Sequence, residues 1–442
     1  MSLHVHVGIY TGQDMINDGM DWDALNTIEE SLKRSWVWFA ESDQLVDHET
    51  RKSQNDISLE CELKLQQLNS IDIEFLSDGR HFNRILSFCG RFYYNKESCV
   101  PWASEKSCQY SKEIVNKLIQ IDQSKVIETI ISDVVTVLNE IKQLGLSNNV
   151  NISGYRQQTR LAINQKLLGQ NYSKVLDQMD SFKLQHVTRM GLINILIENA
   201  DIESNWRYIL PFLLTFLDDA DLGVKREACN SLNEIFKSLL SSEKIKDNII
   251  LKSQTMPLFT NAMQALLLAL PSLTPEWKSR LILPLTYETT FRLYKLAIPN
   301  ELERYTRLGS LLNDTLLPSL SKCKDYVELT LIILSILKDF IKECDGFAIV
   351  LCKQIIYTLI TILMDPFIVH ADKVVLGIID ILQDCIDEIP KERRHKYYYD
   401  IKGCMGTLER RIDRRDGYFQ TLEKEKIDKL MKSVEKKKNM KF

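Results

Sequence analysis

The sequence predicts an all-α protein, a HEAT/armadillo-like α-solenoid of stacked helical hairpins. Glycine and proline number only 16 and 10 among 442 residues, whereas β-sandwiches, barrels and propellers need a turn every few residues. Apolar residues recur at steps of three and four along most of the chain, which is the spacing of one helical face. Short turn-rich breaks then divide the second half of the chain at nearly regular intervals. Together these patterns favour stacked helix pairs.

Composition excludes several other classes of protein. Apolar residues make up 45% and charged residues 26% of the chain, which are ordinary values for a folded globular protein. The longest apolar stretch lies near Leu329–Leu337 and ends at Lys338, well short of the roughly 20 residues that a membrane-spanning helix needs. The first 30 residues are acidic and lack a basic start before an apolar segment, so we expect no secretory signal. The ten scattered cysteines are then expected to be reduced and mostly buried.

The first half of the chain is predicted to hold helices with less regular spacing. We assign residues 1–110 to an N-terminal helical region with acidic loops and residues 111–205 to irregular helical repeats. Apolar spacing predicts helices over 22–39, 57–68, 114–144 and 184–197. Polar or turn-rich stretches predict connections over 1–21, 41–56, 89–110 and 146–154.

Residues 206–389 repeat one plan, in which a helix, a short turn and a returning helix follow one another. The turns begin at residues 218, 271, 321 and 365, at intervals of 53, 50 and 44 residues. Helix pairs that recur every roughly 40–47 residues are typical of HEAT and armadillo arrays. The returning helices are apolar around most of their circumference, so they need partners on several sides, which stacking provides. The predicted pairs are 206–217 with 228–240, 256–270 with 277–296, 302–320 with 326–344, and 347–364 with 371–389.

The first of these hairpins carries a local HEAT signature. Pro211 lies in its first helix, aspartates lie in its turn, and Lys225 lies at the start of its second helix. Asp219 or Asp221 is expected to cap the second helix by accepting from its free backbone N–H groups. Lys225 is expected to pair with a carboxylate of the same or a neighbouring turn. Two further interpretations of these aspartates and of Asp218 stay open, a metal-binding cluster and an acidic patch that faces a partner.

The last predicted region, residues 390–442, is a basic helical segment with a tail. After its first residue it holds 17 basic and 9 acidic side chains, whereas residues 1–80 hold 16 acidic and 6 basic ones. Gly403, Gly406 and Gly417 are expected to interrupt the segment, and Phe419–Val434 is expected to form a thin amphipathic helix. Such a helix can dock on a partner or on the chain itself. The interleaved aromatic residues leave nucleic-acid binding open, although the net charge of −4 argues against it.

No motif for catalysis or cofactor binding is found in the sequence. It lacks a Walker phosphate loop, a dinucleotide-binding glycine pattern, H-E-x-x-H and G-x-S-x-G. Asp18 and Glu29 have the spacing of positions 1 and 12 of a calcium loop, but Asp23 stands where that loop needs glycine. His4 and His6 are the only close histidine pair. We therefore expect no enzyme activity, no cofactor and no metal site.

Three short motifs resemble a known family. Leu217-Asp218-Asp219 follows a Pro-x-Leu-Leu helix and is followed after five residues by Lys225. Together with Thr274-Pro275-Glu276 and Arg307-Leu308-Gly309, this pattern resembles the Tti2 family, the smaller helical-repeat subunit of the TTT cochaperone complex. The resemblance covers roughly residues 206–389.

The resemblance implies a non-enzymatic scaffold that binds the two larger, solenoid-shaped TTT subunits. Such a scaffold supports the folding, assembly and stability of phosphatidylinositol-3-kinase-related kinases, together with the heat-shock chaperone and its adaptor machinery. It also implies a location in the cytoplasm and the nucleus. The client kinases of the family serve TOR signalling, the DNA-damage response and telomere maintenance.

Candidate contacts with the largest TTT subunit lie at the hairpin turns and in the C-terminal half. Each candidate has an alternative role in capping or packing, which is favoured for the two tryptophans. Two other functions stay open, another HEAT-type adaptor such as a transport receptor or phosphatase regulator, and a nucleic-acid-binding solenoid that uses residues 391–442. The candidate residues are Trp206, Arg207, Asp218, Asp219, Asp221, Lys225, Glu276, Trp277 and Arg307.

Overall fold

The fold is helical throughout the part of the chain that the structure describes. This computed structural model describes residue 27 and residues 48–71, 79–149, 188–219, 221–241, 247–413 and 420–434. These residues form helices, turns and connections and contain no strand, which confirms the all-α prediction. Among them, no helix is long and apolar enough to cross a membrane. The chain forms two compact units, residues 1–235 and residues 236–442.

Unit 1 is built around one long helix. The α6 helix (Glu105–Asn149) bends at Asp122, whose backbone has φ −158° and ψ 94°. The Asp122 carboxylate accepts a hydrogen bond from the Lys125 N–H (3.0 Å), so this aspartate caps the second half of α6. Both α3 (His48–Asn69) and α5 (Gly79–Gly90) pack against α6.

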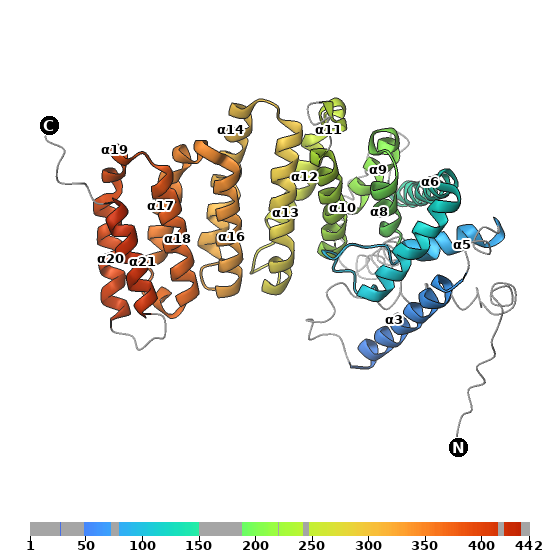
Figure 1. Ribbon diagram of the computed structural model, residues 1–442, viewed down its shortest axis with the longest axis horizontal. Helices are drawn as coiled ribbons and strands as arrows, with labels where there is room; N and C mark the ends of the chain where they lie inside the picture. The colour runs from blue at the N-terminus through green and yellow to red at the C-terminus, as the bar shows by residue number, and fades with distance from the viewer. Residues whose placement is uncertain are drawn as a thin grey trace, which may run out of the picture. The chain divides into compact units, whose positions relative to one another are not determined.

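The other helices that the structure describes in unit 1 follow α6 in sequence. They are α8 (Met190–Asn199), α9 (Ile202–Leu217) and the first part of α10 (Leu222–Ser241), which crosses the boundary between the units. The Asp201 carboxylate caps α9 by accepting from the Ser204 N–H at 2.9 Å. Figure 1 shows α8, α9 and α10 side by side, next to α5 and α6.

Several predicted boundaries in the N-terminal half are wrong. The predicted loop over 41–56 is helical from His48, and Gln54 is buried on the same face of the helix as Cys61, Leu65 and Leu68. The predicted connection over 89–110 shortens to residues 91–104, and α6 continues to Asn149 through much of the predicted break at 146–154. The predicted helix over 22–39, like the segment after residue 149, lies almost wholly outside the described residues.

Unit 2 confirms the stacked hairpins. Figure 1 shows its helix pairs side by side in chain order, each pair running antiparallel. Residues on both helices of neighbouring pairs are fully buried, among them Ile333, Leu359 and Ile378. The pairs are α12 (Met256–Leu267) with α13 (Glu276–Ala297), α14–α15 (Glu301–Leu311 and Leu317–Lys322) with α16 (Val327–Cys344), α17 (Ala348–Leu363) with α18 (Asp372–Glu388), and α20 (Tyr398–Ile412) with α21 (Gln420–Val434).

Short elements complete unit 2. The π-helical turn η4 (Leu312–Leu316) joins α14 to α15 just before Pro318. Proline lacks the N–H that an α-helix would use there, and the wider turn lets one continuous first helix pass the proline. A five-residue helix, α11 (Ile249–Ser253), precedes α12, and α19 (Lys391–Arg394) with η7 (His395–Tyr397) leads into α20.

The C-terminal helices close the stack. Gly403 and Gly406 lie inside α20, so the prediction that they interrupt this segment is wrong, whereas Gly417 lies outside the described residues. A Cβ atom at either glycine would meet nothing within 4 Å, and the buried residues of the other face, such as Leu408, hold the helix together. The predicted amphipathic helix is α21, which packs on α18 and α20 with Ile427 and Leu430 fully buried. The helix thus docks on its own chain.

Candidate partner-binding surfaces

The turn between α9 and α10 uses two of its three aspartates for folding. The Asp221 carboxylate accepts from the backbone N–H groups of Gly223 (2.7 Å) and Val224 (3.0 Å), which confirms its predicted role as the cap of α10. The Asp219 carboxylate accepts from the Asp221 N–H at 2.7 Å and is nearly buried. Asp218 is exposed, so it is the turn carboxylate that is most available to a partner.

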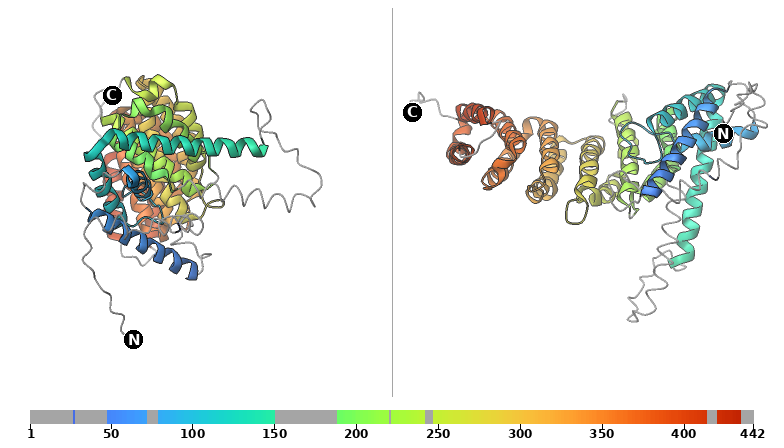
Figure 2. Two further views of the ribbon diagram at one scale, coloured as in Figure 1. Left: turned by 90° about the vertical axis from the view of Figure 1, so that its right-hand side faces the viewer. Right: turned by 90° about the horizontal axis from the view of Figure 1, so that it is seen from below.

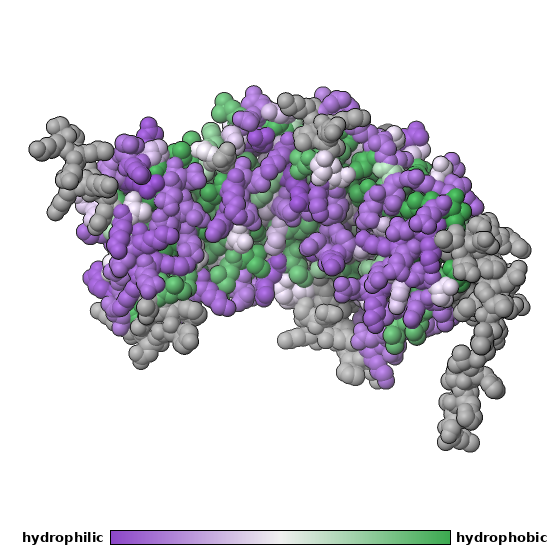
Figure 3. Space-filling model, in the orientation of Figure 1, coloured by the Kyte–Doolittle hydropathy of each residue, from purple (hydrophilic) through white to green (hydrophobic). Residues whose placement is uncertain are grey.

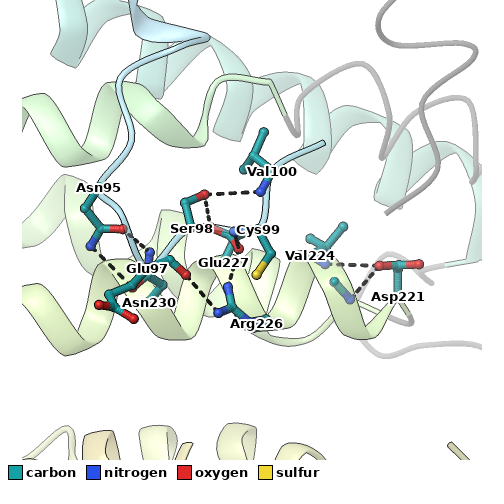
Figure 4. A network of polar contacts seen from close by, with 11 residues as sticks. Asn95, Glu97, Ser98, Cys99, Val100, Asp221, Val224, Arg226, Glu227 and Asn230 are labelled. Atoms are coloured by element: carbon teal, nitrogen blue, oxygen red, sulfur yellow. Dashed lines mark hydrogen bonds and ion pairs between the residues drawn. The ribbon is translucent and has the colours of Figure 1, made fainter. Parts of the chain in front are cut away.

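The start of α10 binds the connection between α5 and α6 through a buried polar network. The Arg226 guanidinium lies 2.6 Å from the Glu227 carboxylate, and their side chains are only 7% and 1% exposed. Glu227 also accepts from the Ser98 hydroxyl (2.7 Å) and from the Cys99 N–H (2.8 Å). Arg226 donates to the carbonyl of Glu97 at 2.8 Å. Figure 4 shows these groups turned toward one another.

This network stabilises unit 1 and offers no reactive group. The side-chain amides of Asn95 and Asn230 face each other, with the Asn230 nitrogen 2.8 Å from the Asn95 oxygen. The Trp102 indole N–H donates to the carbonyl of Arg91 at 2.8 Å, which folds the connection back on itself. The two charges of the ion pair neutralise each other, and the two amides form hydrogen bonds with each other. We therefore assign this cluster a structural role.

The other candidates of unit 1 differ in exposure. Trp206 is 5% exposed, as expected for the packing alternative, so little of its ring can reach a partner. Arg207 is exposed, and its guanidinium lies 4.6 Å from the centre of the Tyr208 ring. Lys225 is half-buried and makes no ion pair within the described residues, so its predicted pairing with a turn carboxylate is not seen.

The candidates of unit 2 lie on two successive helices that belong to different pairs. Glu276 and Trp277 begin α13, directly after the α12–α13 turn, and the Lys278 ammonium lies 5.1 Å from the Trp277 ring centre. Arg307 is exposed on α14 and acts electrostatically on Tyr294, near the other end of α13. The structure therefore does not bring Arg307 together with Trp277.

Apolar side chains are exposed at the turns between first and second helices of unit 2. We call these four residues the turn row: Leu273 is 93% exposed, Phe367 78%, Val327 41% and Tyr326 38%. Their turns join α12 to α13, α15 to α16 and α17 to α18, and Figure 1 places all three turns at the lower edge of unit 2. Figure 3 shows hydrophobic side chains reaching the surface along this edge of a largely hydrophilic face.

The neighbouring turns of this row are linked to one another. The Lys324 ammonium lies 2.5 Å from the Asp365 carboxylate of the next turn, and this contact lowers the pKa of Asp365. Asp365 also accepts from the Phe367 N–H at 3.0 Å. Arg411 donates to the Met364 carbonyl at 3.0 Å from the following layer. These contacts hold successive turns in a fixed arrangement.

The turn row was not predicted from the sequence, although the sequence contains a feature that indicates it. The turns were assigned from their proline, glycine and polar residues, and such turns usually face water. An isolated Leu273 between Pro271 and Pro275, or Phe367 after Pro366, is unusual there. A large apolar side chain inside a predicted turn is therefore the feature that could have indicated this edge.

The cysteines and acidic groups give no evidence of chemistry in the described residues. Eight of the ten cysteines are buried and all are free thiols, in line with the predicted buried thiols. Burial raises the pKa of Cys323 and of Cys404 to about 11, so these thiols stay protonated. Within the described ranges, no group of three or more His, Cys, Asp or Glu side chains is placed to hold a metal ion.

Comparison with known proteins identifies one relationship. No curated protein and no solved structure matches the chain. Residues 90–370 match the Tti2 family, and this range is more than half of the 442 residues. It includes the network at the start of α10 and all three turns of the turn row up to His370. The chain belongs to the Tti2 family.

Proposed function

We propose that this chain is a non-enzymatic scaffold subunit of the TTT cochaperone complex. Its membership of the Tti2 family is the observation that carries the proposal. In this role it supports the folding, assembly and stability of phosphatidylinositol-3-kinase-related kinases in the cytoplasm and nucleus. It acts together with the two larger TTT subunits and, indirectly, with the heat-shock chaperone and its adaptors.

The turn row is the proposed contact surface of unit 2 for the largest TTT subunit. Leu273 and Phe367 expose most of their surface, and burying such side chains at an interface is worth about 1.5–3 kcal/mol each. The turn that carries Phe367 is linked to its neighbours by Lys324 and Arg411, so little conformational freedom of that turn is lost on binding. Glu276 and Trp277 adjoin the row and extend it with a polar rim.

Unit 1 contributes a second, more polar set of proposed contacts. Asp218 and Arg207 are exposed and have opposite charges, which suits recognition by a charged partner surface. Asp219, Asp221 and Trp206 support that surface from below by capping and packing. Lys225, which is half-buried, adds a cation to this set. Arg307, which is exposed on α14 of unit 2, is a separate proposed contact.

Two alternatives are less well supported. A transport receptor or phosphatase regulator would share the stacked hairpins, but the family match favours a TTT subunit. Nucleic-acid binding through residues 391–442 would need a basic face, whereas α21 buries one side of this segment on its own chain and pairs Lys426 with Asp380 at 2.6 Å.

The test is capture of the complex from cells that produce the tagged chain at its natural level. Leu273→Glu combined with Phe367→Glu should abolish recovery of the larger TTT subunits, because a carboxylate would have to be buried in the interface. The matched control is Leu258→Glu combined with Leu302→Glu, which changes leucines that are 49% and 66% exposed near the starts of α12 and α14. Equal recovery with both double variants would contradict the turn-row contact, and failure of the unaltered chain to recover either subunit would contradict the function.

The acidic turn is tested separately. Because the Asp219 carboxylate is used inside the turn, Asp218→Lys alone is the informative charge reversal. It should weaken recovery of the partner by about tenfold or less, as expected for one exposed charge. Glu97→Lys, an exposed change on the neighbouring connection, is the control, and an equal effect of both changes would exclude a specific contact at Asp218.

A further inference from the structure

We propose that α19, η7 and the start of α20, together with the exposed side of α17, bind an acidic peptide segment of a partner protein that carries an apolar side chain. We call this the basic–aromatic surface, and it is formed by Lys353, Tyr357, Lys391, Arg393, Lys396, Tyr399 and Lys402. It lies outside the turn row, so the proposal does not depend on how the largest TTT subunit binds.

Internal contacts fix the helices that form this surface. The Tyr357 hydroxyl donates to the Asp400 carboxylate at 2.8 Å, and the Tyr357 ring lies 6.4 Å from the Tyr397 ring. These contacts join α17 to the start of α20. Arg394 donates to the carbonyls of Ile389 (2.8 Å) and Asp387 (3.0 Å), which anchors α19 to the end of α18. The neighbouring basic side chains therefore project from a rigid base.

Those neighbouring cations are not neutralised within the described residues. Lys353, Lys391, Arg393 and Lys396 are exposed, and none of them makes an ion pair there. Lys402 lies beside them and donates to the Tyr398 hydroxyl at 3.0 Å, with its ammonium 5.2 Å from the centre of that ring. Glu392 and Asp400 are the acidic residues of the same segment, so positive charge is in excess.

The second helices of unit 2 show the opposite arrangement. Their charges pair from one layer to the next, as between Lys295 and Glu343 (2.7 Å) and between Lys338 and Asp384 (3.7 Å). Lys426 likewise lies 2.6 Å from Asp380. Lys353, Lys391, Arg393 and Lys396 make no such pairs within the described residues, so these four cations favour an external, negatively charged partner.

Tyr399 supplies an apolar contact among the cations of the basic–aromatic surface. It is 81% exposed, and its ring meets the Tyr398 ring edge-on at 5.3 Å and 75°. An exposed tyrosine beside cations suits a peptide that combines carboxylates with an aromatic or aliphatic side chain.

A peptide fits this surface better than a nucleic acid. A nucleic-acid strand carries a negative charge at every nucleotide, so it cannot offer an uncharged nucleotide opposite Glu392 or Asp400. A peptide can place neutral residues opposite these carboxylates and its own carboxylates opposite the lysines. The net charge of −4 on the whole chain also opposes a long polyanion more than a short peptide.

The experiment measures fluorescence anisotropy of a labelled peptide titrated with the purified full-length chain. The probe is a peptide of about twelve residues, two of them Phe and the rest Glu, at an ionic strength of about 0.05 M, where charge pairs are weakly screened. Arg393→Glu combined with Lys396→Glu should weaken binding by about tenfold or more, and Tyr399→Ser by about threefold. The peptide without Phe should bind the unaltered chain about threefold less tightly.

The control is Lys322→Glu combined with Lys373→Glu, an equal charge change at exposed positions of other helices, which should alter binding by less than about twofold. Circular dichroism melting of each variant verifies that it is folded. The proposal is overturned by the absence of saturable binding, by equal losses in both double variants, or by tighter binding of an oligouridylate of the same charge.

Discussion

The two units of this chain reach a stable core by different means. Unit 1 joins long helices of unequal length through a buried ion pair at Arg226 and Glu227 and a connection that folds back along α10. Unit 2 stacks similar hairpins through apolar layers and places its ion pairs at the surface, as between Lys324 and Asp365. The comparison teaches that a buried ion pair joins segments of unit 1, whereas the ion pairs of unit 2 between described residues lie at its surface.

This difference has a consequence for binding. Where the polar groups of a turn form hydrogen bonds with one another, as at Asp219 and Asp221, substitutions should lower the stability of the fold more than they change partner binding. Where the core is apolar and layered, the turns bury some side chains, such as Ile368, and can present others, such as Leu273, to a partner. Substitutions of buried polar groups in unit 1 should therefore change stability, and those of exposed apolar side chains at the turns of unit 2 should change binding.

The largest expected effect comes from Gly191→Ala in unit 1. A Cβ atom there would lie 2.1 Å from the carbonyl oxygen of Gly90 and 3.0 Å from that of Tyr93, so α8 would have to move away from α5. We expect a loss of about 3 kcal/mol or more in the stability of unit 1, since backbone atoms cannot repack as side chains do. Native-state hydrogen exchange of α8 and α5 amides measures this loss.

Gly406→Ala in unit 2 is the matched control. Its Cβ atom would meet nothing within 4 Å, and alanine should stabilise α20 by about 0.5–1 kcal/mol because it restricts the unfolded chain. If both substitutions left hydrogen exchange unchanged, the close approach of α5 and α8 would not be a feature of the protein in solution.

Glu227→Ala should have the next largest effect. It leaves the Arg226 guanidinium buried without its carboxylate, which costs about 3–5 kcal/mol. It also removes the acceptor of Ser98 and Cys99, so the connection before α6 should exchange its amide hydrogens faster. Urea unfolding monitored by tryptophan fluorescence and hydrogen exchange measure the two effects.

The control for this substitution is Glu97→Ala. The Glu97 side chain is exposed, and only its backbone carbonyl accepts from Arg226, so the loss should stay within about 0.5 kcal/mol. A comparable loss from both substitutions would show that the buried network contributes nothing specific.

Asp221→Ala should destabilise α10 moderately. The helix loses the acceptor of the Gly223 and Val224 N–H groups, an effect of about 1 kcal/mol. Asp218→Ala, three residues earlier, should change stability by less than about 0.5 kcal/mol, because its side chain is exposed. Thermal unfolding at neutral pH compares the two, and equal shifts would argue against Asp221 as the cap.

The smallest expected effect is a pH dependence at the turns of unit 2. The hydrogen bond from Lys324 lowers the pKa of Asp365 in the folded state. The resulting stabilisation is present above the unfolded pKa of about 3.9 and is lost as the pH falls through the lower folded value. Asp365→Asn keeps the acceptor for the Phe367 N–H but removes this charge. The melting-temperature difference between the two chains should therefore shrink as the pH falls from 7 to below about 3.

The sequence was sufficient to predict the local features of the fold. The helix Val327–Cys344 and its partner before the turn follow from apolar spacing within a short window. The cap at Asp221 follows from its place before a helix start. The glycines of α20 were misjudged because helix propensity is weak beside the packing of the opposite face.

Long-range contacts were beyond such reasoning. Ser98 and Glu227 are 129 residues apart, and no local pattern indicates that they meet. The close approach of Gly90 and Gly191 is equally invisible, since either glycine could simply mark a helix end. The sequence indicates the basic–aromatic surface only as a segment rich in basic and aromatic residues. The structure adds that Arg394 is paired with Asp387, whereas Lys396 makes no ion pair within the described residues.

Hydrogen exchange of the chain within the purified TTT complex, compared with the isolated chain, tests the turn-row contact most directly. We predict slower exchange in residues 268–275, 323–326 and 364–371, the turns that carry or adjoin the turn row, because the partner would exclude water from them. The starts of α12 and α14, which carry Leu258 and Leu302, should exchange at unchanged rates. Protection of those helix starts without protection of the three turns would contradict the account.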